Sequence, residues 1–119
     1  MYELLMVAEV RDWLHRLRKT DLATLMAISD ALTVLRVVGP GLGRPLADRV
    51  ARSSMHNLKE LRPGASGTAE VRILFVFDPR RRAVLLVAGD KAGQWKRWYD
   101  QAIPLAEQRY AEYLKEAGL

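Results

Sequence analysis

The sequence has no cysteine and only two histidines, and these absences exclude several kinds of chemistry. Without cysteine, the chain has neither a disulfide framework nor a thiolate nucleophile. His15 and His56 belong to no cluster of His, Asp and Glu with metal-ligand spacing, so we expect neither a metal nor another cofactor. No basic N-terminal segment precedes a long apolar stretch, and no apolar run reaches membrane-spanning length. We therefore expect a soluble, cytoplasmic protein with no membrane partner.

The length and composition are those of one globular domain. The chain has 119 residues, of which 50% are hydrophobic and 28% are charged, so it can bury one core and does not resemble a disordered segment. The formal net charge is +5, and the excess lies in residues 44–97, which carry twelve Lys and Arg against five Asp and Glu. Such a segment suits a polyanion such as RNA, but it is equally typical of a solvated basic surface.

The N-terminal third predicts an edge strand followed by two helices. Tyr2–Ala8 is short and apolar, as an edge strand would be, and Val10–Arg18 has the spacing of a short amphipathic helix. A second helix is indicated by leucines and an isoleucine at steps of three or four residues, namely Leu22, Leu25, Ile28, Leu32 and Leu35. Thr20 or Asp21 can cap its start, and the Gly-Pro-Gly that begins at Gly39 ends it. Two helices this close in sequence should form an antiparallel hairpin.

The middle of the chain predicts a surface loop and then three strands. Gly41–Ser54 has no convincing period, whereas Asn57–Arg62, Glu70–Asp78 and Ala83–Gly89 are strand-like runs. In the second run one face is wholly apolar and should pack on the helices; its residues are Val71, Ile73, Phe75 and Phe77. Arg72 then lies on the open face. Lys59 and Leu61 should share that face with Arg72, because burying an unpaired ammonium costs several kcal/mol.

The C-terminal part is helical in its spacing. An apolar face runs from Trp95 to Ile103, Pro104 then interrupts, and a second helix should begin there and end near Gly118. The sequence therefore predicts an α+β fold in which an N-terminal strand and a helical hairpin pack on a small, mainly antiparallel, four-stranded sheet, followed by C-terminal helices.

An ordered series of four segments resembles a known family. The segments are GPGLGRPLADRV, HNLKELRPG, EVRILFVFDPRR and LLVAGDKAGQWKRWY. In this order they are similar to the RelE/HigB superfamily of type II toxins, and most similar to its phage-derived HigB-like branch. The resemblance implies a RelE/ParE-like fold for a single toxin domain over residues 1–119. It also implies cleavage of mRNA on the ribosome without a metal, through attack of the 2′-hydroxyl, and neutralisation by a cognate helix-turn-helix antitoxin.

The same resemblance assigns three candidate catalytic residues, and a neighbouring arginine is a fourth candidate. The family's cationic positions fall on Lys59, Arg72 and Lys91, with Arg62 beside them. Guanidinium grips two phosphate oxygens at once, so Arg72 is the candidate stabiliser of the phosphorane. Lys59 is the candidate base, since positive charge from Arg62 and Arg72 would favour its neutral form. Lys91 is the candidate acid or a second phosphate clamp. Many members have an arginine or histidine where Asp90-Lys91 stands here, so the identity of acid and base stays open.

Further residues are candidates for RNA binding. Arg80, Arg81 and Arg82 form a turn that suits phosphate contacts, and Trp95 and Tyr99 offer rings for base stacking. Each has a structural alternative, because turn arginines are usually solvated and helical aromatics are usually core. Arg72 itself could form an ion pair in the sheet with Glu60 or Glu70.

Two other function classes remain open at this point. One is a ParE-like poison of DNA gyrase that performs no catalysis. The other is a decayed, non-catalytic module that binds RNA or the antitoxin. A ribonuclease needs Lys59, Arg72 and Lys91 together on one face of the sheet, whereas the other two classes do not.

Overall fold

A computed structural model describes residues 1–64 and 70–119 as an α+β fold. Helices and strands follow in the order β1 (Leu4–Met6), α1 (Ala8–Thr20), α2 (Leu22–Val38), the 3₁₀ turn η1 (Gly39–Gly41), β2 (Ala47–Arg49), β3 (Lys59–Leu61), β4 (Val71–Phe77), β5 (Ala83–Asp90) and α3 (Trp95–Ala117). One sheet has the strand order β1-β5-β4-β3-β2. β1 pairs with β5 in parallel, and the other neighbours are antiparallel. The predicted fold class and the edge position of the first strand are confirmed.

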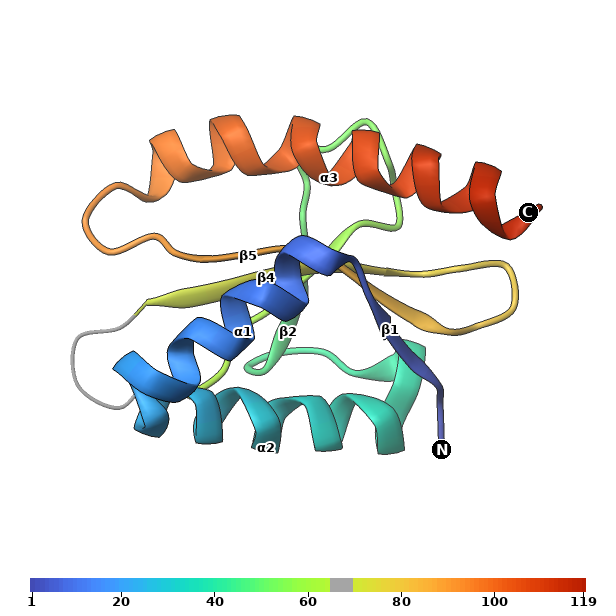
Figure 1. The fold of residues 1–119 in the computed structure, drawn as a ribbon. Coiled ribbons are helices and arrows are strands. Elements are labelled where there is room, and N and C mark those ends of the chain that lie inside the picture. Colours follow the sequence, from blue (N-terminus) through green and yellow to red (C-terminus); the bar gives the residue numbers. More distant parts are fainter. Residues whose placement is uncertain (65–69) are drawn as a thin grey trace.

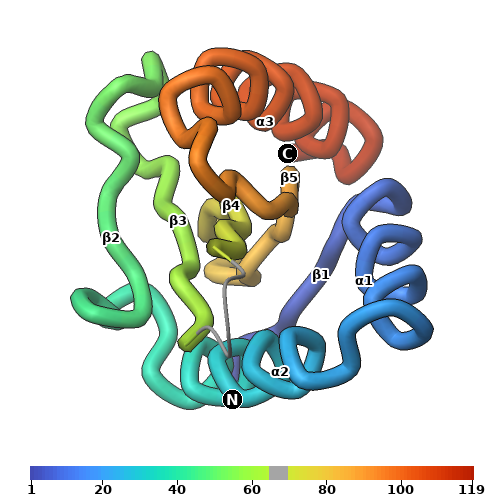
Figure 2. The backbone as a smooth tube through the Cα atoms, turned by 90° about the vertical axis from the view of Figure 1, so that its left-hand side faces the viewer, coloured from blue at the N-terminus to red at the C-terminus, as the bar shows by residue number. Residues whose placement is uncertain are grey.

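The sheet lies between two helical layers (Figure 1). Viewed from the side, α3 covers one face, while α2 and α1 cover the other (Figure 2). Two clusters of buried apolar residues fill the two layers. The cluster on the hairpin side includes Ile28, Leu35 and Phe75, and the cluster on the α3 side includes Leu74 and Ile103. The face of the sheet that we expected to be open is therefore covered by α3.

The helical hairpin forms as its sequence predicts. Asp21 caps α2 by accepting hydrogen bonds from the backbone N–H and the hydroxyl of Thr24, and these bonds lower the pKa of the Asp21 carboxyl. Gly39 ends α2 with a φ of 75°, which favours glycine. A Cβ at this position would also lie 2.2 Å from the ring of Tyr2. The backbone conformation and the nearby ring therefore both favour glycine at position 39.

The alternation in β4 is confirmed. Ile73 and Phe75 are fully buried on the hairpin side, and Leu74 and Val76 are fully buried on the α3 side. The register between β4 and β5 shifts in the middle, because Leu74 pairs with Val87 whereas Phe75 pairs with Leu85. The extra residue in β5 is a bulge, which increases the local twist of the central strands.

Two expected boundaries were wrong. The segment Gly41–Ser54 is not only a loop, because it contains β2, so the sheet has five strands. Three residues are too few for an alternating pattern to be visible in the sequence. Pro104 does not divide the C-terminal part, since α3 runs through it from Trp95 to Ala117. Pro104 is exposed, and the packing of Ile103 and Ala106 on the sheet holds the helix together on both sides of it.

The expectation that no segment reaches membrane-spanning length was also wrong by the measure of length and composition. The segment Leu22–Gly41 is long and apolar enough to cross a membrane. A core helix of a soluble protein passes the same test, and Ile28, Ala31 and Leu35 of this segment are buried against the sheet. The segment is weak support for any membrane association.

We expect the buried stripe of α2 to contribute far more to stability than its outer residues. Ile28 is 0% exposed, whereas Leu22, which we expected in the same stripe, is 56% exposed. Ile28→Ala should lower the free energy of unfolding by about 2–5 kcal/mol, because it leaves a cavity in the core. Leu22→Ala is the matched control and should cost less than about 0.5 kcal/mol. Urea denaturation measures both, and equal losses would refute the orientation of α2.

The carboxylate of Asp78 should make stability depend on pH. Burial alone would raise its pKa, but hydrogen bonds from the Arg82 backbone, Tyr113 and the Arg82 side chain outweigh burial and lower the pKa below 3.8. The contribution is therefore fully present above pH about 4 and is lost as the pH falls through the lowered pKa. Asp78→Asn should destabilise the protein at neutral pH. The difference in thermal midpoint between Asp78→Asn and the parent chain should become smaller below pH 3.8. A difference that does not depend on pH would contradict this role of Asp78.

Candidate functional site

Arg72 lies near the start of β4, on the face that α3 covers. It pairs across the strands with Gly89, and its Nη1 donates to the carbonyl of Val71 at 2.8 Å. Its Nε is buried and has no hydrogen-bond partner among the residues that the structure describes. A buried donor without a partner costs about 1–3 kcal/mol, so this nitrogen is an unusual group for the inside of the described fold.

The indole of Trp98 lies directly over the strand beside Arg72. A Cβ at Gly89 would be only 2.6 Å from the indole nitrogen of Trp98, so only glycine allows this approach. Trp98 in turn packs edge-on against Tyr99, with ring centroids 5.1 Å apart. The first turns of α3 therefore form an aromatic cover next to Arg72.

A buried carboxylate joins three further side chains at this place. Glu60 of β3 is 4% exposed and accepts a short hydrogen bond from the phenol of Tyr99. Arg62 donates to the same carboxylate, with Nη2 at 2.7 Å and Nε at 2.8 Å from Oε2. Arg62 also reaches Asp48 of β2 at 3.3 Å. The network thus connects β2 and β3 with α3.

The electrostatic environment shifts the pKa of two members of this network, Tyr99 and Arg62. Burial, and then the hydrogen bond to Glu60, raise the pKa of Tyr99 to about 12, although Arg72 acts in the opposite direction. Burial would lower the pKa of Arg62, but the hydrogen bond to Glu60 and the charges of Glu60 and Asp48 raise it overall. At neutral pH the Tyr99 phenol therefore stays protonated, and its hydroxyl donates a hydrogen bond to Glu60.

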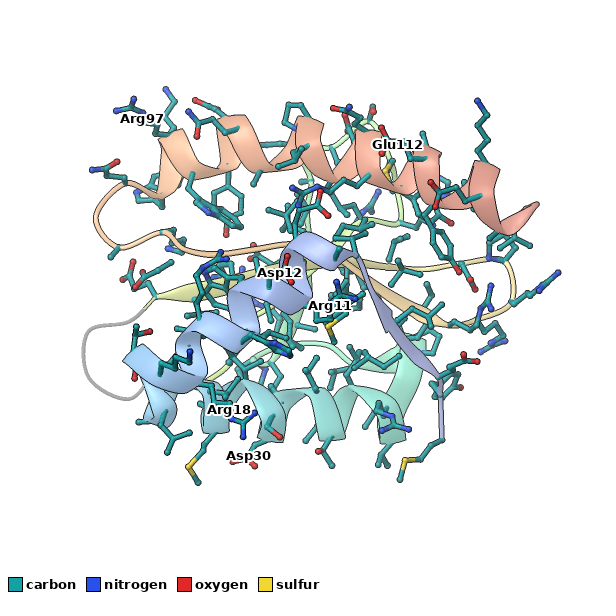
Figure 3. All side chains as sticks on the ribbon, in the orientation of Figure 1. Arg11, Asp12, Arg18, Asp30, Arg97 and Glu112 are labelled. Carbon is teal, nitrogen blue, oxygen red and sulfur yellow. The ribbon has the colours of Figure 1, made fainter. Side chains whose placement is uncertain are left out.

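Lys91 lies just beyond β5, at the same end of the sheet as Arg72. Its backbone N–H donates to the carbonyl of Glu70, and its ammonium is 3.5 Å from the Glu70 carboxylate. Lys91 and Trp98 line a surface hollow of about 270 Å³ together with Arg97. Figure 3 shows Arg97 at the N-terminal end of α3. Trp95, in the same turn, is 56% exposed and offers a free ring surface.

Lys59 does not share a face with Arg72, and that prediction was wrong. In the register of β3 and β4, Lys59 pairs with Phe75 and Leu61 pairs with Ile73, all on the hairpin side. The ammonium of Lys59 donates to the carbonyl of Pro40 at 2.7 Å, at the end of α2. A flexible lysine can lie on a packed face in this way, because its stem reaches along the surface to a carbonyl acceptor.

The turn between β4 and β5 lies away from Arg72. Arg72 and this turn are at opposite ends of β4, roughly 17 Å apart along the strand. Arg82 is held there by Asp78, at 2.9 Å, and by the hydroxyl of Tyr113. Its guanidinium therefore has structural partners in the fold, and its assignment to RNA binding stays a prediction. Arg80 and Arg81 are exposed, so phosphate contacts through these two stay a prediction.

The sequence interpretation missed two residues of the site. Glu60 was considered only as an ion-pair partner of Arg72, yet it holds Tyr99 and Arg62. Its position two residues before Arg62 on a strand places both on one face, which was the available signal. Trp98 was placed only on the apolar face of the C-terminal helix, together with Trp95 and Tyr99, and its contact with Gly89 depends on the placement of α3. Among residues 1–64 and 70–119, no group of His, Asp and Glu is arranged to hold a metal ion.

Comparison with known proteins shows the family. The profile of the family described as "Phage derived protein Gp49-like" matches residues 12–111. The chain is 47% identical over 110 residues to "Putative toxin HigB3" of Mycobacterium tuberculosis (strain ATCC 25618 / H37Rv), covering 92% of this chain and 91% of that protein. It is also 47% identical over 110 residues to "Putative toxin HigB2" of the same strain, where it spans 53% of the length.

No solved structure matches the chain. The matched segment includes both helices of the hairpin in large part, the strands that carry Glu60 and Arg72, and most of α3. The sequence similarity therefore extends over the whole site and not only over the hydrophobic core. On these grounds the chain belongs to the phage-derived Gp49-like family and is a HigB-like toxin.

Proposed function

We propose that this toxin is a metal-independent endoribonuclease that cleaves mRNA on the ribosome in the cytoplasm. The observation that carries the proposal is the state of Arg72. Its guanidinium lies beside Tyr99 and has a buried Nε without a partner among the described residues. It also forms no ion pair with any carboxylate in that part of the chain, so no carboxylate there neutralises its charge.

The chemistry that fits this arrangement is attack of a ribose 2′-oxygen on the adjacent phosphorus. The bond from phosphorus to the 5′-oxygen then breaks, which leaves a 2′,3′-cyclic phosphate and a 5′-hydroxyl. Arg72 would stabilise the additional negative charge of the phosphorane, since preorganised donors are most effective in a site shielded from water. Lys91, at the same end of the sheet, would clamp the phosphate or protonate the leaving oxygen.

As a HigB-like toxin, the chain has an antitoxin partner. We propose that this partner carries a helix-turn-helix domain. The family resemblance supports this type of antitoxin, and an adjacent reading frame that encodes such a protein would test it directly.

Poisoning of DNA gyrase without catalysis is the second candidate function. The placement of Lys59 favours it, because one of the three cations expected in a ribonuclease site lies on the other face. Primer extension on ribosome-bound mRNA separates the two candidates. Cuts within the mRNA support the ribonuclease, and DNA breaks without mRNA cuts support the gyrase poison.

Expression of the chain without an antitoxin should arrest bacterial growth. The expected effect is loss of colony formation on induction, and it should disappear in Arg72→Ala at equal levels of soluble protein. Normal growth with verified, folded parent protein would contradict the toxin activity of this copy.

Substitution of Arg72 should separate activity from stability. Arg72→Ala should lower mRNA cleavage on ribosomes by on the order of 10²–10³-fold, because a preorganised donor is lost. Arg72→Lys should restore only part of the rate, since a point charge cannot replace a two-pronged contact. The thermal midpoint should change little in both variants. Cleavage at the parental rate in Arg72→Ala would place the active site elsewhere.

Lys59→Ala provides the comparison on the opposite face of the sheet. It should leave the rate of mRNA cleavage near that of the parent and lower stability by about 0.5–2 kcal/mol, because the carbonyl of Pro40 in η1 loses a charged donor. A loss of cleavage as large as in Arg72→Ala, without unfolding, would return Lys59 to the site.

A further inference from the structure

A hollow of about 460 Å³ lies between β1 and the C-terminal half of α3. The apolar side chains of Leu5, Val7 and Val84 line it from the sheet and its edge, and Tyr113 lines it from α3. Among the described residues, β1 is the last strand on this side of the sheet. The hollow therefore lies where the side chains of one further strand would pack beneath α3.

The outer edge of β1 has backbone groups that can pair with such a strand. Glu3 and Val7 each form a backbone hydrogen bond with β5. Bonding directions alternate along a strand, so the N–H and C=O groups of Leu4 and Met6 point away from β5. Within residues 1–64 and 70–119, no loop or helix bonds to these groups. In Figure 1, α1 runs from the end of β1 toward the other end of the sheet, so it does not lie alongside this edge. An unpaired edge is a template for another chain.

The hollow is acidic, although the chain as a whole has a formal net charge of +5. Glu9 lines it from the start of α1, and Glu112 and Glu116 line it from α3. Figure 3 shows Glu112 on this half of the helix. Arg109 also lines the hollow, but its guanidinium donates to the carbonyl of Leu86 and lies 3.5 Å from the Glu9 carboxylate. It offsets one of the three carboxylates, so the hollow keeps an excess of negative charge and attracts cations.

We propose that the free edge of β1 binds an extended segment of the antitoxin that carries apolar and basic side chains. The backbone of this segment pairs with Leu4 and Met6 and continues the sheet. Its side chains on the α3 side fill the hollow. A lysine or arginine among them lays its stem on the apolar floor and places its charge beside Glu112 and Glu116.

The antitoxin is the occupant that the observations favour. Membership of the toxin family shows that the chain has such a partner. RNA fits poorly, because its phosphates would meet three glutamates. A second copy of this chain also fits poorly, since antiparallel pairing of two β1 strands brings Glu3 of each copy toward Glu9 of the other, and like charges across an interface oppose association. The proposal does not depend on the ribonuclease function, because binding can be measured without cleavage.

The first test removes two charges from the hollow. Glu112→Gln/Glu116→Gln should weaken binding of the separately purified cognate antitoxin by about 10-fold at low ionic strength. The loss should become smaller at high salt, because salt screens exposed charges. Asp12→Asn/Asp30→Asn is the matched control, since it changes the net charge equally at two exposed residues of the hairpin (Figure 3). Calorimetric titration measures both. Equal losses in the two double variants would reveal a general charge effect and refute the role of the hollow.

The second test fills the hollow without changing its charge. Ala8 is exposed and lines the hollow, so the indole in Ala8→Trp would occupy the space that the antitoxin segment needs. Binding should fall by at least about 10-fold at low and at high salt alike. Ala23→Trp, at an exposed position near the start of α2, is the control and should bind as the parent does. Parental affinity in folded Ala8→Trp would overturn the proposal.

The third test follows the backbone of β1 directly. In the saturated complex with the antitoxin, the amides of Leu4 and Met6 should exchange hydrogen at least about 10-fold more slowly than in the free chain, as NMR can measure. The amide of Leu5, which faces β5, should change little. Unchanged exchange at both Leu4 and Met6 would show that no strand pairs with this edge. This measurement uses the parent chain, so it decides the matter even if Ala8→Trp does not fold.

The outcomes also separate the possible occupants. If the chain alone forms a dimer in solution that Ala8→Trp disrupts, a second copy occupies the edge and the proposal is refuted. If the antitoxin binds but neither the variants nor the two amides respond, it docks elsewhere, and the proposal is refuted as well. If the antitoxin does not bind the parent chain at all, the proposal fails with its partner. None of these results depends on whether the toxin cuts mRNA.

Discussion

Two buried carboxylates fix α3 over the sheet, and the arrangement of the site depends on them. Glu60 and Asp78 are each bound by one arginine of the sheet or its turn and by one tyrosine of α3. The tyrosines are Tyr99 and Tyr113, which are about four helical turns, or roughly 21 Å, apart on the same side of the helix. A carboxylate without partners would be very costly inside the protein, so α3 cannot slide or rotate without losing both contacts. Apolar packing between these two points then fills the layer.

The two contacts differ in what surrounds them. Around Asp78 the turn closes completely, because the backbone N–H groups of Arg80 and Arg82 also bind the carboxylate. Around Glu60, in contrast, lies the guanidinium of Arg72, whose buried Nε has no hydrogen-bond partner among residues 1–64 and 70–119. Proteins keep such unsatisfied groups mainly where a ligand completes them. The same type of contact is therefore structural at one end of α3 and is suited to chemistry at the other.

The sequence predicted side-chain orientation correctly where a periodic pattern of apolar residues packs against a single layer of the fold. The stripe of α2 and the apolar face of β4 were correct at Ile28 and Phe75, because both side chains pack into the same layer between the hairpin and the sheet. The prediction failed at Lys59, since it assumed that the second face of the sheet was exposed to solvent and that a lysine must point there. Once α3 covers that face, the cost of burial no longer favours it, and Lys59 reaches a carbonyl on the hairpin side. No local pattern around Lys59 reveals how a distant helix packs.

The positive charge of residues 44–97 can be located on the structure once the ion pairs of its lysines and arginines are considered. Arg62, Arg82 and Lys91 lie within 4 Å of carboxylates of the same segment, which the formal count already includes. Only Arg52 pairs with a carboxylate outside it, Asp100, so these ion pairs remove little of the excess and leave it on the other cations. The first turn of α3 keeps its charge, because Lys96 and Arg97 are exposed there and no acidic residue accompanies them. Cations at a helix N-terminus oppose the helix dipole by about 0.3–1 kcal/mol each, so they do not stabilise the folded chain there. Together with the exposed ring of Trp95, they favour approach of a polyanion from the N-terminal end of α3, next to Arg72.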